Sequence, residues 1–327
     1  MRRRDVITLI GGATLALPRV ARAQTMRRIG VLMSYAENDT EGQARYVAFR
    51  DGLRKLGWVA DRNIRIDTRW ASLDAQSMQS SAKQLVAMQP EVILSANTPT
   101  TAALLQQTRT IPIVIANISD PIGSGFVTSL ARPAGNVTGF LNIEGSLGGK
   151  WVELLKEIAP RVARIAFLHN PQAAPFAAYY FDPFKASASR FGMEAITTPV
   201  HDAPGLESVV TAQAREPNGG LIVMPDAFMT AHRAQIISLA AQHRLPTVYP
   251  YRFQAQIGGL LSYGFDPHHN FGRAASYVDR ILKGDKSGEL PFQAQDKFEL
   301  AINLKTAKAL GLDVPILLQQ RADEVIE

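Results

Sequence analysis

The chain has 327 residues, of which 46% are hydrophobic and 20% charged, and it contains no cysteine. This length suggests about two domains. The composition allows sizeable cores and excludes a disordered or coiled-coil chain. The lack of cysteine excludes a disulfide framework, a thiolate nucleophile, a cysteine-ligated metal site and a lipid-bearing cysteine. The formal charge of +6, from 35 Lys plus Arg against 29 Asp plus Glu, suggests a nucleic-acid or membrane-surface partner.

Residues 1–23 predict a cleaved export signal, which changes the meaning of this charge. Three arginines, Arg2 to Arg4, precede an apolar run from Val6 to Leu17 and an Ala-x-Ala site that ends at Ala23. The Arg-Arg-x-apolar order resembles a twin-arginine signal, although export by the general route stays open. Cleavage after Ala23 removes five arginines and one aspartate and lowers the net charge to +2. We therefore expect a periplasmic protein without a membrane anchor rather than a cytoplasmic protein with a basic tail.

Short β-branched runs then alternate with longer amphipathic stretches, which is typical of βαβ units with parallel sheets. The expected strands are residues 28–33, 63–69, 91–95, 111–116, 164–168, 193–198, 220–224 and 246–249. The expected helices are residues 41–56, 73–88, 99–108, 148–158, 174–191, 204–215, 227–243 and 270–283. One more strand beginning near Ile257 and another beginning near Lys297 are expected to complete these sheets.

Three strands of the first half have counterparts in the second half. Ile29 aligns with Ile165, Val92 with Ile222 and Pro112 with Pro246, at similar separations in the sequence. This repetition predicts an α/β fold of two Rossmann-like lobes with parallel sheets, joined by a three-segment hinge. We expect residues 24–138 and about 256–288 in lobe 1, and about 139–255 and 289–327 in lobe 2.

A ligand site is expected where the carboxyl ends of the two sheets face each other across the hinge. Polar and aromatic residues follow the strands at this edge and are our candidate ligand-binding residues: Ser34, Tyr35, Asn97, Thr98, Thr100, Asp120, Asn170, Tyr179, Asp226, Phe228 and Tyr251. The aromatic members would suit a flat or apolar ligand body, although each one alone is as typical of packing.

Two of these positions favour a ligand with charged groups. Thr98 can cap a helix with Pro99 in its first turn, and the free N–H groups of that turn would bind a carboxylate. Asp226 follows a buried strand and could hold a ligand ammonium. Each residue has a purely structural alternative, because Thr98 and Asp226 can simply cap their helices, and Asp120 before Pro121 can simply form a turn.

No sequence pattern indicates catalysis, a cofactor or a metal. His268 and His269 form no spaced metal-binding set, and Ser80-x-x-Lys83 matches an S-x-x-K motif but lacks the S-D-N and K-T-G elements that support it. Neither a nucleophile elbow, a P-loop nor a complete dinucleotide fingerprint occurs. The basic residues are spread among acidic neighbours, which argues against nucleic-acid binding.

Long segments of the chain resemble the periplasmic substrate-binding proteins of ABC transporters, in particular those similar to tryptophan- and tyrosine-binding proteins. The segments are SDPIGSGFVTSLARPAGNVTGF, GGLLSYGFDP, YVDRILKGDKSGELPFQ and KFELAINLKTAKALGLDVP. The resemblance implies a type I periplasmic-binding-protein fold and a partner permease with its ATPase. It also implies a carboxylate contact at Thr98 to Thr101 and an acidic contact at Asp226.

Two departures from the family leave the ligand's identity open. Tyr35-Ala36 stands where many relatives have His-Pro, and Ala227 follows Asp226 where amino-acid binders often have Asn. Phe228 favours an aromatic ligand body. We therefore expect a monomeric carrier, without cofactor, for an aromatic amino acid or an aromatic acid. An exported enzyme using Asp120, His169 and Asp226, or a periplasmic ligand receptor, remains the alternative.

Overall fold

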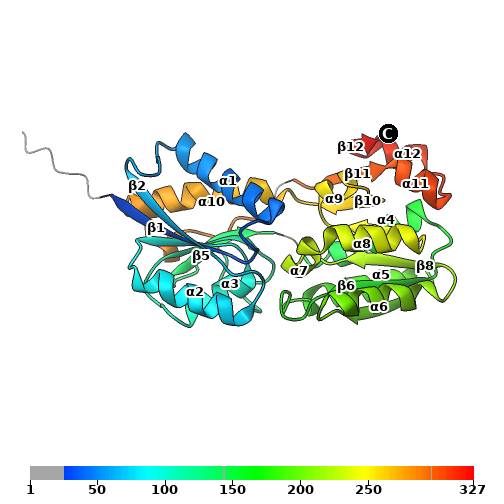
Figure 1. Cartoon of the computed structure of the whole chain (residues 1–327), viewed down its shortest axis with the longest axis horizontal. Helices are drawn as coiled ribbons and strands as arrows, with labels where there is room; N and C mark the ends of the chain where they lie inside the picture. Colours follow the sequence, from blue (N-terminus) through cyan, green and yellow to red (C-terminus); the bar gives the residue numbers. More distant parts are fainter. Residues whose placement is uncertain (1–25, 143, 296) are drawn as a thin grey trace, which may run out of the picture.

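The computed structural model describes residues 26–142, 144–295 and 297–327, so the predicted export signal lies outside the described residues. Two lobes lie side by side along the long axis of the molecule (Figure 1). Each lobe has a β-sheet with helices on both faces. In the described ranges, no helix combines the length and the apolar character needed to cross a bilayer.

The first lobe contains a parallel sheet of order β2-β1-β3-β4-β5. The strands are β1 (Arg27–Met33), β2 (Ile64–Trp70), β3 (Val92–Ser95), β4 (Ile113–Ile118) and β5 (Val137–Leu141). All residues of β3 and β4 are buried, because a central parallel strand is covered on both faces. Helices α1 (Thr40–Lys55) and α10 (Pro267–Leu282) pack on one face, and α2 (Ala75–Ala87) and α3 (Thr98–Leu105) on the other. A short 3₁₀ turn, η1 (Ser287–Glu289), follows α10.

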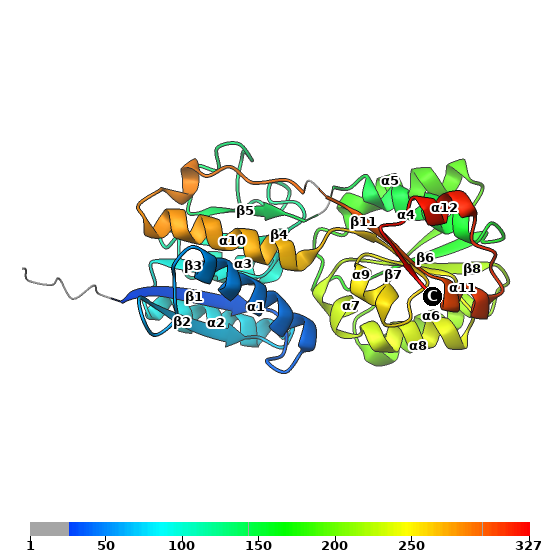
Figure 2. The same ribbon diagram turned by 90° about the horizontal axis from the view of Figure 1, so that it is seen from above.

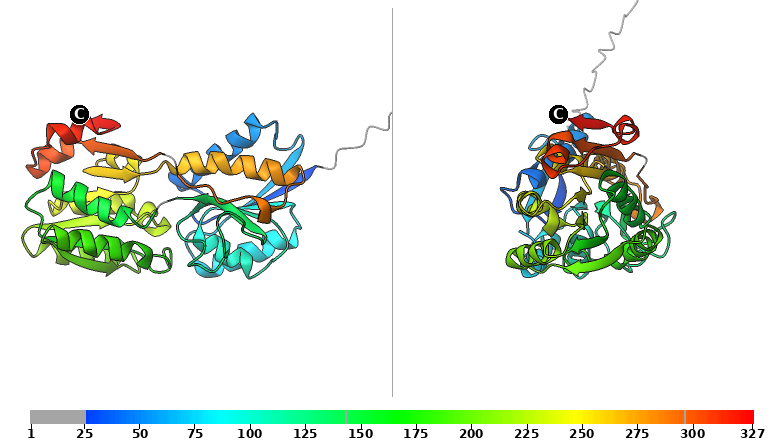
Figure 3. Two further views of the ribbon diagram at one scale, coloured as in Figure 1. Left: turned by 180° about the vertical axis from the view of Figure 1, so that it is seen from behind. Right: turned by 90° about the vertical axis from the view of Figure 1, so that its right-hand side faces the viewer.

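The second lobe contains a sheet of order β12-β11-β10-β9-β8-β6-β7. Its strands are β6 (Arg164–His169), β7 (Glu194–Pro199), β8 (Gly219–Val223), β9 (Thr247–Tyr249), β10 (Leu261–Gly264), β11 (Glu299–Asn303) and β12 (Glu324–Ile326). Helices α4 (Leu147–Ile158) and α5 (Ala178–Arg190) cover one face, and α6 (Ala203–Ala214) and α8 (Arg233–Gln242) cover the other. The short helices are α7 (Ala227–Ala231), α9 (Arg252–Gln256), α11 (Leu304–Leu310) and α12 (Ile316–Gln320). The C-terminal elements lie on this lobe (Figure 3).

The sheet orders confirm the predicted pair of similar lobes. The order β2-β1-β3-β4-β5 in the first lobe matches β7-β6-β8-β9-β10 in the second, so the three aligned sequence segments occupy equivalent strands. Only β11 and β12 have no counterpart in the first sheet, and β11 runs antiparallel to β10.

The lobe boundaries differ from those expected from the sequence. β5 pairs with β4, so the first lobe extends to Leu141 rather than ending at residue 138. β10 pairs with β9 and β11, which places residues 261–264 in the second lobe and leaves α10 to cross back alone. Phe292 packs in the first lobe's core, so the last crossing follows it rather than residue 288. The chain still crosses between the lobes three times (Figure 2).

Candidate functional site

The lobes contact each other along the edges where the strands end. Arg233 of α8 donates hydrogen bonds to Asp39 Oδ2 (3.1 Å) and to Thr40 Oγ1 (2.7 Å), both at the start of α1. Leu73 of the first lobe packs against the cores of both lobes, and Ala227 of the second lobe packs into the core of the first. The structure therefore shows the two lobes closed on each other.

A cavity of about 540 Å³ lies between the lobes. Its first-lobe wall includes Ser34, Leu73, Met78 and Pro99, and its second-lobe wall includes Asn170, Ala173, Pro175, His201, Phe228 and His232. The Phe228 ring lies 4.3 Å from the His232 ring, between centroids. Three predicted residues, Ser34, Asn170 and Phe228, thus line a largely apolar space of the size typical of small-molecule sites.

Polar atoms are buried without a hydrogen-bond partner at the same strand-end edges. Within the described residues they include Thr98 Oγ1, Asn117 Nδ2 and Ser119 Oγ of the first lobe, and the Tyr180 hydroxyl of the second. Tyr180 faces Ser119, and burial raises the pKa of its hydroxyl. An unsatisfied buried donor or acceptor costs about 1–3 kcal/mol, so such a concentration is typical of a site that completes its hydrogen bonds with a ligand.

Helix α3 begins one residue earlier than expected, because its N-cap is Asn97 rather than Thr98. Asn97 Oδ1 accepts from the Thr100 N–H at 3.3 Å, and the Thr100 hydroxyl accepts from the Asn97 N–H at 3.0 Å. Asn97 also donates to Ser34 Oγ at 2.8 Å. Pro99 has no N–H, so Thr98 supplies the donors that this helix end leaves for a ligand.

Asp226 has structural partners for both carboxylate oxygens. Oδ1 accepts from the Met229 N–H at 2.7 Å, which caps α7, and Oδ2 accepts from the Asn170 N–H at 2.9 Å. Burial raises the pKa of Asp226 to about 7, although these backbone hydrogen bonds oppose the rise. The Asn170 side chain also bonds to backbone, donating to Val200 O and accepting from the Ala173 N–H. Asp226 and Asn170 thereby fix the strand ends of the second lobe.

Tyr35 and Tyr251 both lie against one arginine, Arg45. The Arg45 guanidinium carbon is 5.1 Å from the Tyr35 ring centroid and 5.4 Å from that of Tyr251. Both tyrosines are buried, and Tyr251 also packs against Phe253 and Phe265. These two predicted residues therefore meet across the lobes through a side chain that was not predicted.

Asp120 and Tyr179 occupy more peripheral positions. Asp120 Oδ1 accepts from the Gly123 N–H at 2.7 Å, so Asp120 forms the turn that was the structural alternative for this residue. Tyr179 is 42% exposed, whereas its neighbour Tyr180 is fully buried and stacks on Trp151. Adjacent helical residues point in different directions, and the structure turns Tyr180 rather than Tyr179 toward the cleft.

Sequence reasoning missed Arg45, Ser119 and the orientation of Tyr180. A signal for Arg45 exists in α1, where residues 41, 45, 49 and 53 follow each other at helical spacing and all are buried. A charged pair on the stripe that also carries Phe49 and Leu53 is unusual and indicates a buried polar site.

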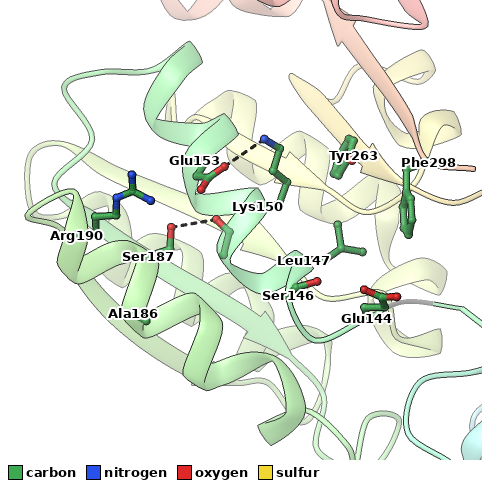
Figure 4. Close-up of a pocket in the computed structure, with 11 residues that line it drawn as sticks. Glu144, Ser146, Leu147, Lys150, Glu153, Ala186, Ser187, Arg190, Tyr263 and Phe298 are labelled. Carbon is green, nitrogen blue, oxygen red and sulfur yellow. Dashed lines mark hydrogen bonds and ion pairs between the residues drawn. The ribbon is translucent and has the colours of Figure 1, made fainter.

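A second cavity, of about 560 Å³, lies on the outside of the second lobe between α4 and α5 (Figure 4). Its polar side chains largely pair with the lobe itself. Lys150 pairs with Glu153 at 3.1 Å, and Ser187 donates to Gly149 O at 3.1 Å. None of its residues is among the buried, unpartnered groups of the described chain. No cluster of three or more metal-ligating side chains occurs in the described ranges.

Comparison with known proteins agrees with this geometry. A tyrosine-binding protein from Clostridioides difficile (strain R20291) is 25% identical over 267 residues, which is 81% of this chain and 75% of that protein. The structure is similar to an ABC domain from Streptococcus pneumoniae in complex with L-Trp (TM-score 0.84, 26% identity). It is also similar to a conserved domain protein from Vibrio cholerae O1 biovar eltor strain N16961 (TM-score 0.85, 28% identity). Both alignments cover 92% of this chain and 99% of the other.

The family model for ABC transporter substrate binding proteins matches residues 32–326, which is nearly the whole described chain. Such proteins bind small ligands and work with a permease and an ATPase. With the two closed lobes and the interlobe site, this match shows that the chain belongs to the ABC transporter substrate-binding protein family.

Proposed function

We propose that this protein binds an aromatic amino acid or aromatic acid between its lobes and delivers it to the permease of an ABC importer. The observation that carries the proposal is that an apolar surface and a set of unpaired buried polar atoms occur together between the lobes. The cavity beside Phe228 and Met78 is largely apolar. Buried polar atoms of Thr98, which precedes the lining residue Pro99, and of Ser119 and Tyr180 have no hydrogen-bond partner in the described chain. An aromatic body suits the first surface and a carboxylate suits the second.

The relatives support the same class of ligand, since one is named for tyrosine and another was crystallised with L-Trp. We further propose that the chain acts in the periplasm as a monomer after removal of residues 1–23, and that it needs no cofactor. Catalysis is not part of the proposal, because Asp120, His169 and Asp226 make no hydrogen bond to one another within the described residues.

Thermal unfolding of residues 24–327 with a ligand panel tests this function. The panel contains L-tryptophan, L-tyrosine, indole-3-acetate, sugars and nucleosides. At a concentration 100 times Kd, a true ligand adds about 2.7 kcal/mol to the free energy of unfolding. Stabilisation by aromatic acids alone is expected. Stabilisation only by sugars or nucleosides would contradict the proposal, and chemical conversion of the stabilising compound would favour an enzyme.

A matched pair of variants locates the site. Ser119→Ala removes a buried hydroxyl at the cleft and is expected to weaken ligand binding several-fold. Ser187→Ala removes a hydroxyl from the outer groove between α4 and α5 and should leave the affinity unchanged. The reverse pattern would place the ligand in the outer groove.

A further inference from the structure

Arg45 is a buried cation with an incomplete set of hydrogen bonds. The side chain is 6% exposed. Nε donates to Glu41 Oε1 at 3.0 Å, and Nη1 donates to the Tyr35 hydroxyl at 2.7 Å. Nη2 is buried and has no partner within the described residues. A guanidinium carries five donors in a fixed plane, and leaving buried ones unpaired is costly, so this nitrogen indicates a missing acceptor.

The position of Arg45 places that acceptor between the lobes. Its guanidinium lies close to the ring of Tyr35 from the first lobe and to the ring of Tyr251 from the second. Aromatic faces attract a cation but accept no strong in-plane hydrogen bond. A planar carboxylate is the acceptor that best matches the guanidinium edge.

The charged groups around Arg45 hold its guanidinium in the charged form and in one position. Glu41 is paired with two groups, Arg45 and the His268 Nε2 atom at 3.1 Å. Burial lowers the pKa of His268, but the ring donates to the carboxylates of Asp266 and Glu41, and these contacts raise the pKa to about 9. His268 is therefore charged at neutral pH, and the two cations, Arg45 and His268, are paired with two carboxylates, Glu41 and Asp266. Asp266, the other partner of His268, has a side chain that is 46% exposed.

The N-terminal end of α3 offers a ligand carboxylate no positively charged donor. Its capping box occupies the Thr100 N–H, and Pro99 has no N–H. Thr98 can contribute a hydroxyl and a backbone N–H, both neutral donors. A carboxylate at the cleft would thus find its only charge-assisted donor among these groups at Arg45.

We infer that Arg45 is the anion receptor of the interlobe site and donates from Nη2 to the carboxylate of the bound ligand. Glu41, which is itself paired with His268, and the Tyr35 hydroxyl hold the guanidinium in place, and the Tyr251 ring lies close to it. This inference rests on the proposed function and adds the residue that binds the ligand's carboxylate, so the uncharged amide of a ligand should bind more weakly than the acid.

Calorimetric titration with acid and amide pairs tests the assignment. The probes are L-tryptophan with L-tryptophanamide and L-tyrosine with L-tyrosinamide. The wild-type protein should bind the acids about 10 to 100 times more tightly than the amides, since one charge-assisted hydrogen bond accounts for such a factor. Arg45→Gln should lose at least tenfold in acid affinity and less than threefold in amide affinity. Arg50→Gln, on the same helix beside Tyr46, is the control and should match the wild type.

The outcomes separate the two proposals. Equal losses for acid and amide in Arg45→Gln, or no loss for the acid, would overturn the role of Arg45 while leaving the proposed function intact. A wild-type protein that binds none of the four probes would overturn the proposed function and this inference with it. Arg45→Lys keeps the buried charge beside Glu41 if Arg45→Gln does not fold. In Arg45→Lys, the ratio of acid affinity to amide affinity should fall at least fivefold, and an unchanged ratio would overturn the assignment.

Discussion

Arg233 links the two lobes, and its removal should weaken ligand binding; within its own lobe it also removes the hydrogen bond that Nη1 donates to Thr230 O at 2.8 Å. The guanidinium contacts Asp39 Oδ2 at 3.1 Å and Thr40 Oγ1 at 2.7 Å across the lobe boundary. The Arg233 and Asp39 side chains are only 16% and 15% exposed, so solvent screens this ion pair less than a surface pair. Asp39 would still cap α1 through its Oδ1 contact with the Gly42 N–H.

The size of the effect follows from these contacts. A hydrogen bond between charged groups contributes about 1.5–3 kcal/mol, and an exposed ion pair about 0–1 kcal/mol. A partly buried pair plus one hydroxyl contact should therefore stabilise the closed state by about 1.5 kcal/mol. Because these contacts form only when the lobes close, Arg233→Ala should raise Kd roughly tenfold.

Titration calorimetry measures the affinity, and stopped-flow fluorescence measures ligand dissociation, which should be faster in Arg233→Ala. The control is Arg321→Ala, because Arg321 pairs with Glu157 at 3.0 Å entirely within the second lobe. The control should keep the wild-type affinity. An affinity for Arg233→Ala within twofold of the wild type, with an unchanged dissociation rate, would refute the assignment of Arg233 as a closure contact.

Three further predictions concern single groups. Tyr180→Phe removes a buried hydroxyl without a partner in the described chain, so calorimetry should show several-fold weaker ligand binding while urea unfolding without ligand shows no loss of stability. Asp226→Ala removes a buried cap and its bond to Asn170, so urea unfolding should show a loss of about 2–4 kcal/mol; a loss below 0.5 kcal/mol would contradict the capping role. His268 has its pKa raised from 6.5 to about 9, so its contribution to stability is fully present below pH 6.5 and is lost as the pH rises through 9. His268→Gln should flatten the pH dependence of the unfolding free energy between pH 6.5 and 9, and an unchanged slope would count against the ion pair with Glu41.

The fold could be predicted from the sequence because strand patterns and their repetition are local properties. The apolar runs of β1, β3 and β4 recur in β6, β8 and β9. Because the strands of both lobes are connected in the same sequence, the two sheets have the same strand order. The lobe of a late strand could not be predicted in this way. β10 has an apolar pattern that suits either sheet, and only its pairing with β9 and β11 places it in the second.

The site was predictable where it depends on strand ends and unpredictable where it depends on helix orientation. The parallel-sheet rule indicates Ser34, Asn170 and Phe228, which line the interlobe cavity. It gives no information on Arg45, which reaches the cleft from the second turn of α1. For Asp226, sequence allows a ligand contact or a helix cap, and the choice depends on the Asn170 N–H that arrives from another strand.

A crystal structure with the best ligand of the thermal-shift panel tests the central claim most directly. Binding between the lobes predicts an aromatic ring in the cavity beside Phe228 and a carboxylate within hydrogen-bond distance of Thr98 Oγ1 and Arg45 Nη2. Ligand density in the outer groove between α4 and α5, or a carboxylate turned toward solvent with these two atoms still unpaired, would contradict the account.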